Sequence, residues 1–146
     1  MLTDAIHDQI KDLCEEGDVY AEEERWAEAI AQYSHAWQLV PEPKEQFEAT
    51  TWILAALGDA NFLRGAYPEA QESLSFAMRC PGAIGNPFIH LRLGQTQLEL
   101  QNLEGAADEL ARAYMGAGHD IFRDEAPKYF AFIKTRMKPP PGGWEA

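Results

Sequence analysis

The sequence predicts an all-α fold, a short right-handed α-solenoid of three helix–turn–helix repeats followed by a C-terminal capping helix. The main observation is a repeated spacing after three glycines, Gly17, Gly58 and Gly94. A small, a large apolar and a second small residue follow each glycine at offsets of 12, 16 and 19 residues. Recurrence at fixed offsets is typical of repeat architectures. The residues at these offsets are Ala29, Tyr33 and Ala36, then Ala70, Leu74 and Ala77, then Ala106, Leu110 and Ala113.

Turn signals between the glycine and the first alanine of each repeat divide it into two helices. The helices are expected near residues 3–23, 26–39, 44–63, 67–79, 86–101 and 104–116. Pro41 ends the first pair, and Pro68 suits the first turn of a helix, where its missing N–H costs nothing. We expect the glycine and the first alanine to mark a close approach of the two backbones, with the large apolar residue filling the gap to the next helix.

A seventh helix is expected over residues 122–138, where apolar and aromatic side chains are frequent. It would cover the open apolar face of the third repeat, as a solenoid requires at its end. The tail, residues 139–146, contains three prolines and two glycines and is predicted to be extended. Trp144 in this tail either folds back onto the body or stays exposed. The apolar side chains of the seventh helix are Phe122, Tyr129, Phe130, Phe132, Ile133 and Met137.

Two segments, residues 26–36 and 67–77, resemble the second helix of the tetratricopeptide repeat (TPR), whose period is about 34 residues. The resemblance implies one TPR domain over residues 1–138, with repeats at about 10–43, 51–84 and 87–120. The spacing departs from the family, because Gly17 to Gly58 is 41 residues and Gly58 to Gly94 is 36. The aromatic residue that the family often carries early in the first helix is replaced here by Leu13, Leu54 and His90.

The charge is strongly acidic, with 24 Asp and Glu against 12 Lys and Arg, a formal net of -12. Residues 1–48 alone hold 13 acidic and three basic residues. This surplus disfavours nucleic acid, whose phosphates it would repel, and it suits a basic protein partner docking at the N-terminal third. A solvated surface without a specific partner is the alternative.

Several function classes lack sequence support. No apolar run approaches the roughly 20 residues of a membrane span, and the acidic start does not resemble a signal peptide, so a cytoplasmic protein is expected. Phosphate-binding loops, His-Glu-x-x-His and Gly-x-Ser-x-Gly motifs are missing from the sequence. Cys14 and Cys80 have no metal-type spacing. We therefore expect no enzyme, no cofactor and no metal site, and the sequence favours no oligomeric state.

In the TPR family the first helix of each repeat lines a concave groove, and the resemblance carries this role to matching positions here. Three of these positions, Glu15, Asp18 and Glu22, form one helical stripe at i, i+3 and i+7. The Lys and Asn residues of carboxylate-binding TPR grooves are largely Asp, Glu or apolar here, so that mode is disfavoured. The expected partner-binding residues are Lys11, Glu15, Asp18 and Glu22; Trp52, Asp59 and Phe62; and Phe88, Arg92, Gln95 and Glu99.

The segments 86–94 and 126–132, together with the size and charge, resemble short bacterial TPR proteins encoded beside polymorphic toxins. This resemblance implies an immunity-type inhibitor that covers the active site of a basic toxin domain. The alternative is an adaptor or secretion chaperone that holds an amphipathic client segment.

Overall fold

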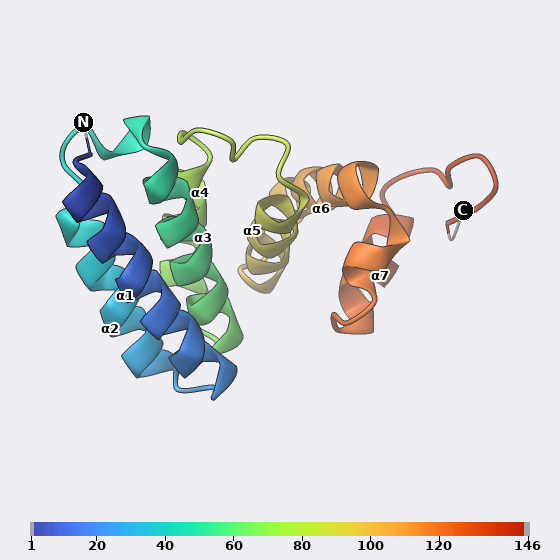
Figure 1. Cartoon of the computed structure of the whole chain (residues 1–146). Helices are drawn as coiled ribbons and strands as arrows, with labels where there is room; N and C mark the ends of the chain where they lie inside the picture. Colours follow the sequence, from blue (N-terminus) through green and yellow to red (C-terminus); the bar gives the residue numbers. More distant parts are fainter. Residues whose placement is uncertain (1, 145–146) are drawn as a thin grey trace. The chain divides into compact units, whose positions relative to one another are not determined.

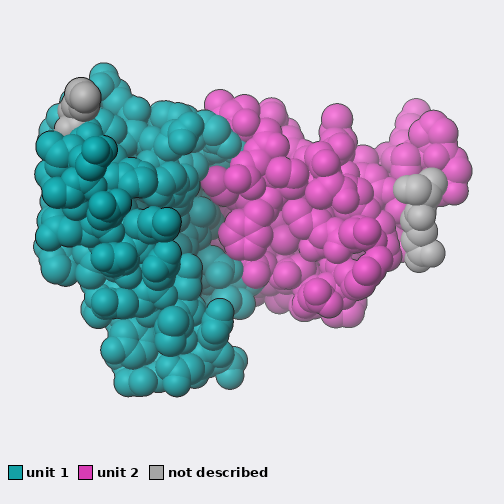
Figure 2. All heavy atoms as spheres, viewed as in Figure 1, with its two compact units in different colours: residues 1–83 teal, residues 84–146 magenta. Residues whose placement is uncertain are grey.

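The computed structural model describes residues 2–144, and all the regular secondary structure in this range is helical. The chain divides into two compact units, residues 1–83 and residues 84–146, shown in different colours in Figure 2. The expected all-α helical-repeat class is confirmed. The single domain expected over residues 1–138 stays a prediction, and each unit is described by itself.

Unit 1 contains two antiparallel helix pairs, α1 with α2 and α3 with α4 (Figure 1). Each helix packs mainly on its neighbour in sequence, and α1 also contacts α3. A side-chain cap starts α1, where the Thr3 hydroxyl accepts a hydrogen bond from the backbone N–H of Ile6. The elements of unit 1 are α1 (Asp4–Glu22), α2 (Trp26–Leu39), the 3-10 helix η1 (Lys44–Gln46), α3 (Glu48–Leu63) and α4 (Tyr67–Ala77).

Unit 2 contains the third pair, α5 with α6, and a short C-terminal helix, α7, that packs on α6. Asn86 caps α5 by accepting hydrogen bonds from the N–H groups of Phe88 and Ile89. Gly118 ends α6 with a positive φ of 72°, a conformation that favours glycine. The elements of unit 2 are α5 (Pro87–Glu99), α6 (Leu103–Ala117), the 3-10 helix η2 (His119–Phe122) and α7 (Pro127–Lys134).

The repeated glycines lie opposite the large apolar residues 16 positions later. A Cβ atom added to Gly17 would lie less than 3 Å from the ring of Tyr33, and one added to Gly58 would meet Leu74 equally closely. Gly94 has the same relationship to Leu110. The large residue therefore packs on the glycine of its own helix pair, a more specific contact than the expected filling of a gap to the next helix.

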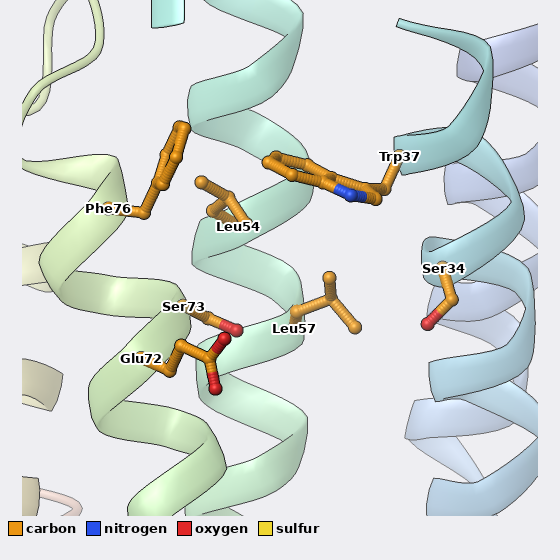
Figure 3. A pocket seen from close by; sticks show the side chains of 7 residues that line it. All are labelled: Ser34, Trp37, Leu54, Leu57, Glu72, Ser73 and Phe76. Carbon is orange, nitrogen blue, oxygen red and sulfur yellow. The ribbon is translucent and has the colours of Figure 1, made fainter. Parts of the chain in front are cut away.

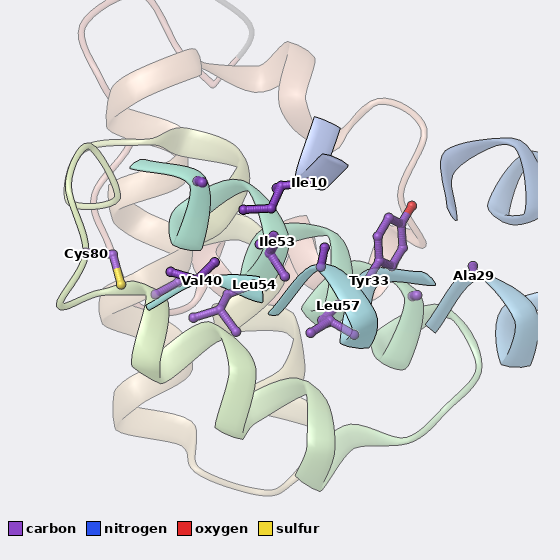
Figure 4. Close-up of a cluster of buried hydrophobic side chains, with 12 residues drawn as sticks. Ile10, Ala29, Tyr33, Val40, Ile53, Leu54, Leu57 and Cys80 are labelled. Atoms are coloured by element: carbon purple, nitrogen blue, oxygen red, sulfur yellow. The ribbon is translucent and has the colours of Figure 1, made fainter. Parts of the chain in front are cut away.

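The core of unit 1 lies where α1, α2 and α3 meet, and Figure 4 shows its side chains converging. Ile10, Tyr33 and Ile53 are buried at its centre. Each large side chain removed from water in this way contributes about 1.5–3 kcal/mol. Cys80 joins this core and Cys14 packs against it, so both cysteines are apolar packing residues.

Two helices are shorter than the sequence predicts by four residues or more. The helix expected from residue 44 begins at Glu48, because Phe47 is extended (φ -109°, ψ 136°) and separates η1 from α3. The helix expected over residues 122–138 spans Pro127–Lys134 only. Pro127 explains the later start, since a residue before proline is disfavoured in the α conformation and Ala126 is extended.

The tail folds back onto unit 2, which decides between the two expectations for Trp144. The backbone carbonyl of Trp144 accepts a 2.6 Å hydrogen bond from the hydroxyl of Tyr114 on α6. Its indole lies edge-on to the rings of Tyr114 and Phe130, at 5.6 and 5.9 Å between centroids. The end of the expected tail, residues 145–146, lies outside the described residues.

Candidate protein-interaction surface

Helix α1 is the most acidic element of the chain. It carries seven carboxylates and one lysine, Lys11, and each of these side chains is exposed. Unit 1 as a whole has sixteen acidic and five basic residues, a net of -11, so almost all of the surplus negative charge belongs to this unit. The carboxylates of α1 are Asp4, Asp8, Asp12, Glu15, Glu16, Asp18 and Glu22.

These carboxylates are not neutralised within the chain. Among residues 2–144, no lysine, arginine or histidine side chain forms an ion pair with an acidic residue of α1. The nearest cation in sequence after the helix, Arg25, instead pairs with Glu28 at 2.7 Å. This pair raises the pKa of the guanidinium and lowers that of the carboxyl. Like charges on one helix face repel one another, so a cationic partner would relieve that repulsion.

Asp18 differs from the other residues of the predicted acidic stripe, because its carboxylate accepts a 2.5 Å hydrogen bond from the hydroxyl of Tyr33 on α2. Burial, together with this hydrogen bond and the charge of Asp18, raises the pKa of Tyr33. Burial and the charges of Asp18 and Glu15 raise the pKa of Cys14 to about 11, so its thiol stays protonated at neutral pH. Asp18 thus joins two helices, whereas Glu15 and Glu22 make no comparable contact.

An aromatic group lies at the N-terminal end of the same face. The indole of Trp52 on α3 is 44% exposed and meets the imidazole of His7 on α1 edge-on, with 5.6 Å between ring centroids. Asp59 lies two turns further along α3, and its charge contributes to the raised pKa of Tyr33. We call this surface the α1–α3 face, with aromatic rings at one end and carboxylates at the other. It comprises His7, Lys11, Glu15, Asp18, Glu22, Trp52 and Asp59.

Phe62 was expected on the partner-binding surface, but its side chain is buried. Its ring lies 5.7 Å from that of Tyr67, the first residue of α4. The neighbouring Leu63 is the exposed apolar side chain at this end of α3. Neighbouring residues on a helix point about 100° apart, so an error of one residue in matching the chain to the family changes which of Phe62 and Leu63 is expected to be exposed.

In unit 2 most of the expected partner-binding residues contact the C-terminal segment instead. Arg92 is buried and donates to Glu125 at 2.6 Å, and Gln95, with no exposed surface, donates to the same carboxylate at 2.8 Å. Glu99 accepts a hydrogen bond from the Tyr129 hydroxyl and pairs with Lys128. The structure therefore turns Arg92 and Gln95 into the interior and engages Glu99 with α7.

Phe88 is the exception on α5, since it is 38% exposed and the guanidinium of Arg92 lies over its ring at 5.1 Å. Sequence reasoning missed Glu125, which fixes Arg92 and Gln95. Glu125 stands two residues before Pro127, and the sequence there carries no local pattern that predicts contacts with residues 30 or more positions earlier.

The described residues hold no group of three or more His, Cys, Asp or Glu side chains arranged to bind a metal ion. Within residues 2–144, no helix has both the length and the apolar character needed to cross a membrane.

Comparison with known proteins shows the fold. Neither the protein-family models nor the curated proteins contain a match to this chain. Among solved structures, it is similar to the C-terminal TPR-containing domain of a putative FK506-binding protein from Plasmodium falciparum. The TM-score is 0.71 at 17% sequence identity, over 92% of this chain and 90% of that one. The chain thus has a TPR-like helical-repeat fold.

Proposed function

We propose that this protein binds a basic protein partner through the α1–α3 face. The observation that carries the proposal is the set of seven exposed carboxylates on α1, none of which forms an ion pair with a side chain of residues 2–144. Complementary charge of this kind speeds association and selects against acidic partners. The exposed indole of Trp52 supplies the apolar anchor that charged surfaces need for tight binding.

Within this function, we propose an immunity-type inhibitor that covers the active site of a toxin domain. Enzymes that act on nucleic acid carry basic surfaces for phosphate, and a net charge of -11 on unit 1 complements such a surface. The sequence interpretation that residues 86–94 and 126–132 resemble short TPR proteins encoded beside toxins points in the same direction. Such an inhibitor acts in the cytoplasm and needs no catalytic residue of its own.

The alternative is an adaptor or secretion chaperone for an amphipathic client segment. The pairing of Trp52 with His7 at one end of the α1–α3 face favours it, since an apolar side chain of a helix or strand could pack there. The two functions differ in salt dependence. Association with a basic folded domain slows steeply as salt rises, whereas an apolar peptide is bound with little change.

The test compares two double charge reversals with the same change in net charge. Glu15→Lys/Glu22→Lys alters the α1–α3 face and leaves the Asp18–Tyr33 hydrogen bond in place. Glu45→Lys/Glu69→Lys alters two exposed carboxylates elsewhere in unit 1 and is the matched control. Each variant and the wild type are used to capture partners from native lysate at low salt, and association rates with the captured protein are then measured across salt concentrations.

We expect one basic protein to be captured by the wild type and the control and lost by the α1 variant. A partner retained equally by both variants would show that α1 is an ordinary solvated helix. The chaperone alternative would be supported by a captured protein whose association rate does not change with salt concentration but is lower with the Trp52→Ala variant.

A further inference from the structure

Unit 1 has a recess on the side of α3 that faces away from the α1–α3 face. Leu54 and Leu57 form its floor, and the walls are side chains of α2 and α4 (Figure 3). These leucines follow Trp52 by two and five residues, which turns them by about 200° and about 140° from it around the helix. The recess is therefore separate from the α1–α3 face. We call it the trough, lined by Ser34, Trp37, Leu54, Leu57, Glu72, Ser73 and Phe76.

The aromatic end of the trough is fixed before any ligand arrives. The rings of Trp37 and Phe76 meet edge-on at 5.4 Å between centroids. Lys44 lies over the Trp37 ring and donates hydrogen bonds to the carbonyls of Trp37 and Val40, and Arg79 lies over Phe76 at 4.3 Å. A wall held in this way loses little conformational entropy on binding, which favours affinity.

The size and chemistry of the trough define its occupant. Its volume of about 200 Å³ exceeds the roughly 150 Å³ of an apolar cavity that holds benzene. One aromatic ring or branched aliphatic side chain therefore fits over Leu54 and Leu57. At the rim, the exposed carboxylate of Glu72 lies beside the hydroxyl-bearing Ser73 and offers a contact for a cation next to that apolar group.

We propose that the trough is a peptide-binding site, which takes one large apolar side chain flanked by a basic residue. Such a segment combines a ring for the floor with a cation for Glu72, and its positive charge matches unit 1 as a whole. The site stands independently of the α1–α3 face, because none of its lining residues is part of that face.

The experiment uses the tryptophans of the full chain as site-specific reporters. Trp37 lines the trough, Trp52 lies on the α1–α3 face, and Trp26 and Trp144 lie elsewhere. Their indole N–H signals in a ¹⁵N-correlated NMR spectrum are assigned by single Trp→Phe variants and followed during titration with the peptide acetyl-Arg-Phe-Arg-amide. We expect a saturable shift of the Trp37 signal. A Trp52 signal that moves instead of the Trp37 signal would place the peptide on the α1–α3 face and overturn the trough proposal, while the proposed function is tested separately by partner capture.

Two variants and two peptides make the outcome decisive. Ser73→Leu fills the trough with a side chain that is favourable in helices, and it should abolish the Trp37 shift. Replacing Phe by Ala in the peptide should do the same. Glu72→Gln should weaken the arginine peptide about twofold to fivefold, as expected for one exposed ion pair, and leave acetyl-Gln-Phe-Gln-amide unchanged. No saturable Trp37 shift in the wild type, or an equal shift in Ser73→Leu or with the Ala peptide, would overturn the proposal.

Discussion

The hydroxyl of Tyr33 donates a hydrogen bond to the carboxylate of Asp18, and its ring packs on Gly17, one residue earlier in α1. One tyrosine thereby fixes both the distance and the rotation of α1 against α2. All seven carboxylates of α1 are exposed, and Asp18 is the one that this contact ties to α2. Within the acidic stripe, Asp18 therefore contributes to helix packing, whereas Glu15 and Glu22 make no comparable contact.

We predict that Tyr33→Phe lowers the free energy of unfolding by about 1 kcal/mol, the usual net value of one hydrogen bond. The ring stays packed on Gly17, so only the bond to Asp18 is lost. Asp18→Asn retains an acceptor oxygen and should cost less. Glu15→Gln is the matched control, expected within about 0.5 kcal/mol of wild type. Urea unfolding followed by circular dichroism measures all three, and an equal loss in Glu15→Gln would contradict the assignment.

Stability should fall at alkaline pH. The pKa of Cys14 is raised to about 11 and that of Tyr33 is raised further above its ordinary value, so the folded chain holds protons that the unfolded chain releases. In the unfolded chain the pKa is about 8.5 for the cysteine and about 10 for the tyrosine. The stabilisation from the raised pKa values is therefore complete below about pH 8.5 and is lost as pH rises toward the pKa values of the folded chain. Urea midpoints between pH 7 and 10.5 measure this decline.

The double variant Cys14→Ser/Tyr33→Phe is the control for this pH dependence. Neither new residue titrates in the range, so the decline above about pH 8.5 should become shallower. An unchanged slope would assign the alkaline loss to other groups.

His90 should be sensitive to replacement by the aromatic residue that the TPR family often carries there. Its Nε2 accepts a 2.9 Å hydrogen bond from the backbone N–H of Gly85, so the proton lies on Nδ1 and is donated to Glu109. His90→Phe keeps an aromatic ring at this position but removes the hydrogen bonds to the Gly85 N–H and to the Glu109 carboxylate. We expect a loss of roughly 1–3 kcal/mol in the free energy of unfolding.

Glu109→Gln is the milder control, because its amide oxygen can still accept from Nδ1–H. Nitrogen chemical shifts of the imidazole measure the tautomer directly. A proton found on Nε2, or a stable His90→Phe variant, would contradict this account of the site.

The helical-repeat fold could be predicted from the sequence because its signals are local and repeated. The glycine at each close contact and the large apolar residue 16 positions later are both required by packing, and the structure brings them together in all three pairs. Helix ends were less predictable. Pro127 was visible in the sequence, yet the aromatic residues around it suggested a longer helix than the structure contains.

The candidate site could be predicted only where exposure follows from helix periodicity. Glu15, Glu22 and Trp52 are exposed as expected. Arg92 and Gln95 are not, because Glu125 reaches them from 30 or more residues away. The sequence does not distinguish a polar helical residue that is exposed from one that binds a distant segment of its own chain. The trough could not be predicted from the sequence either, because its lining residues come from three helices, α2, α3 and α4, that meet only in the folded chain.

The repeat contact itself can be tested at Gly58, where an added Cβ would lie less than 3 Å from Leu74. Gly58 is helical, so alanine there gains helix propensity of about 1 kcal/mol but overpacks a tight contact at a cost of about 1–3 kcal/mol. We therefore expect Gly58→Ala to be destabilising. Leu74→Ala alone should cost about 2–5 kcal/mol because it opens a cavity in a buried site.

The two changes should not be additive, since the new methyl group partly fills the space that Leu74 vacates. The double variant Gly58→Ala/Leu74→Ala should be more stable than the sum of the single losses by about 0.5–3 kcal/mol, measured as a coupling energy from urea unfolding. Gly58→Ala with Leu110→Ala is the matched control, because Leu110 packs on Gly94 in unit 2 instead. Additivity in both pairs would mean that the glycine is present for some reason other than this contact.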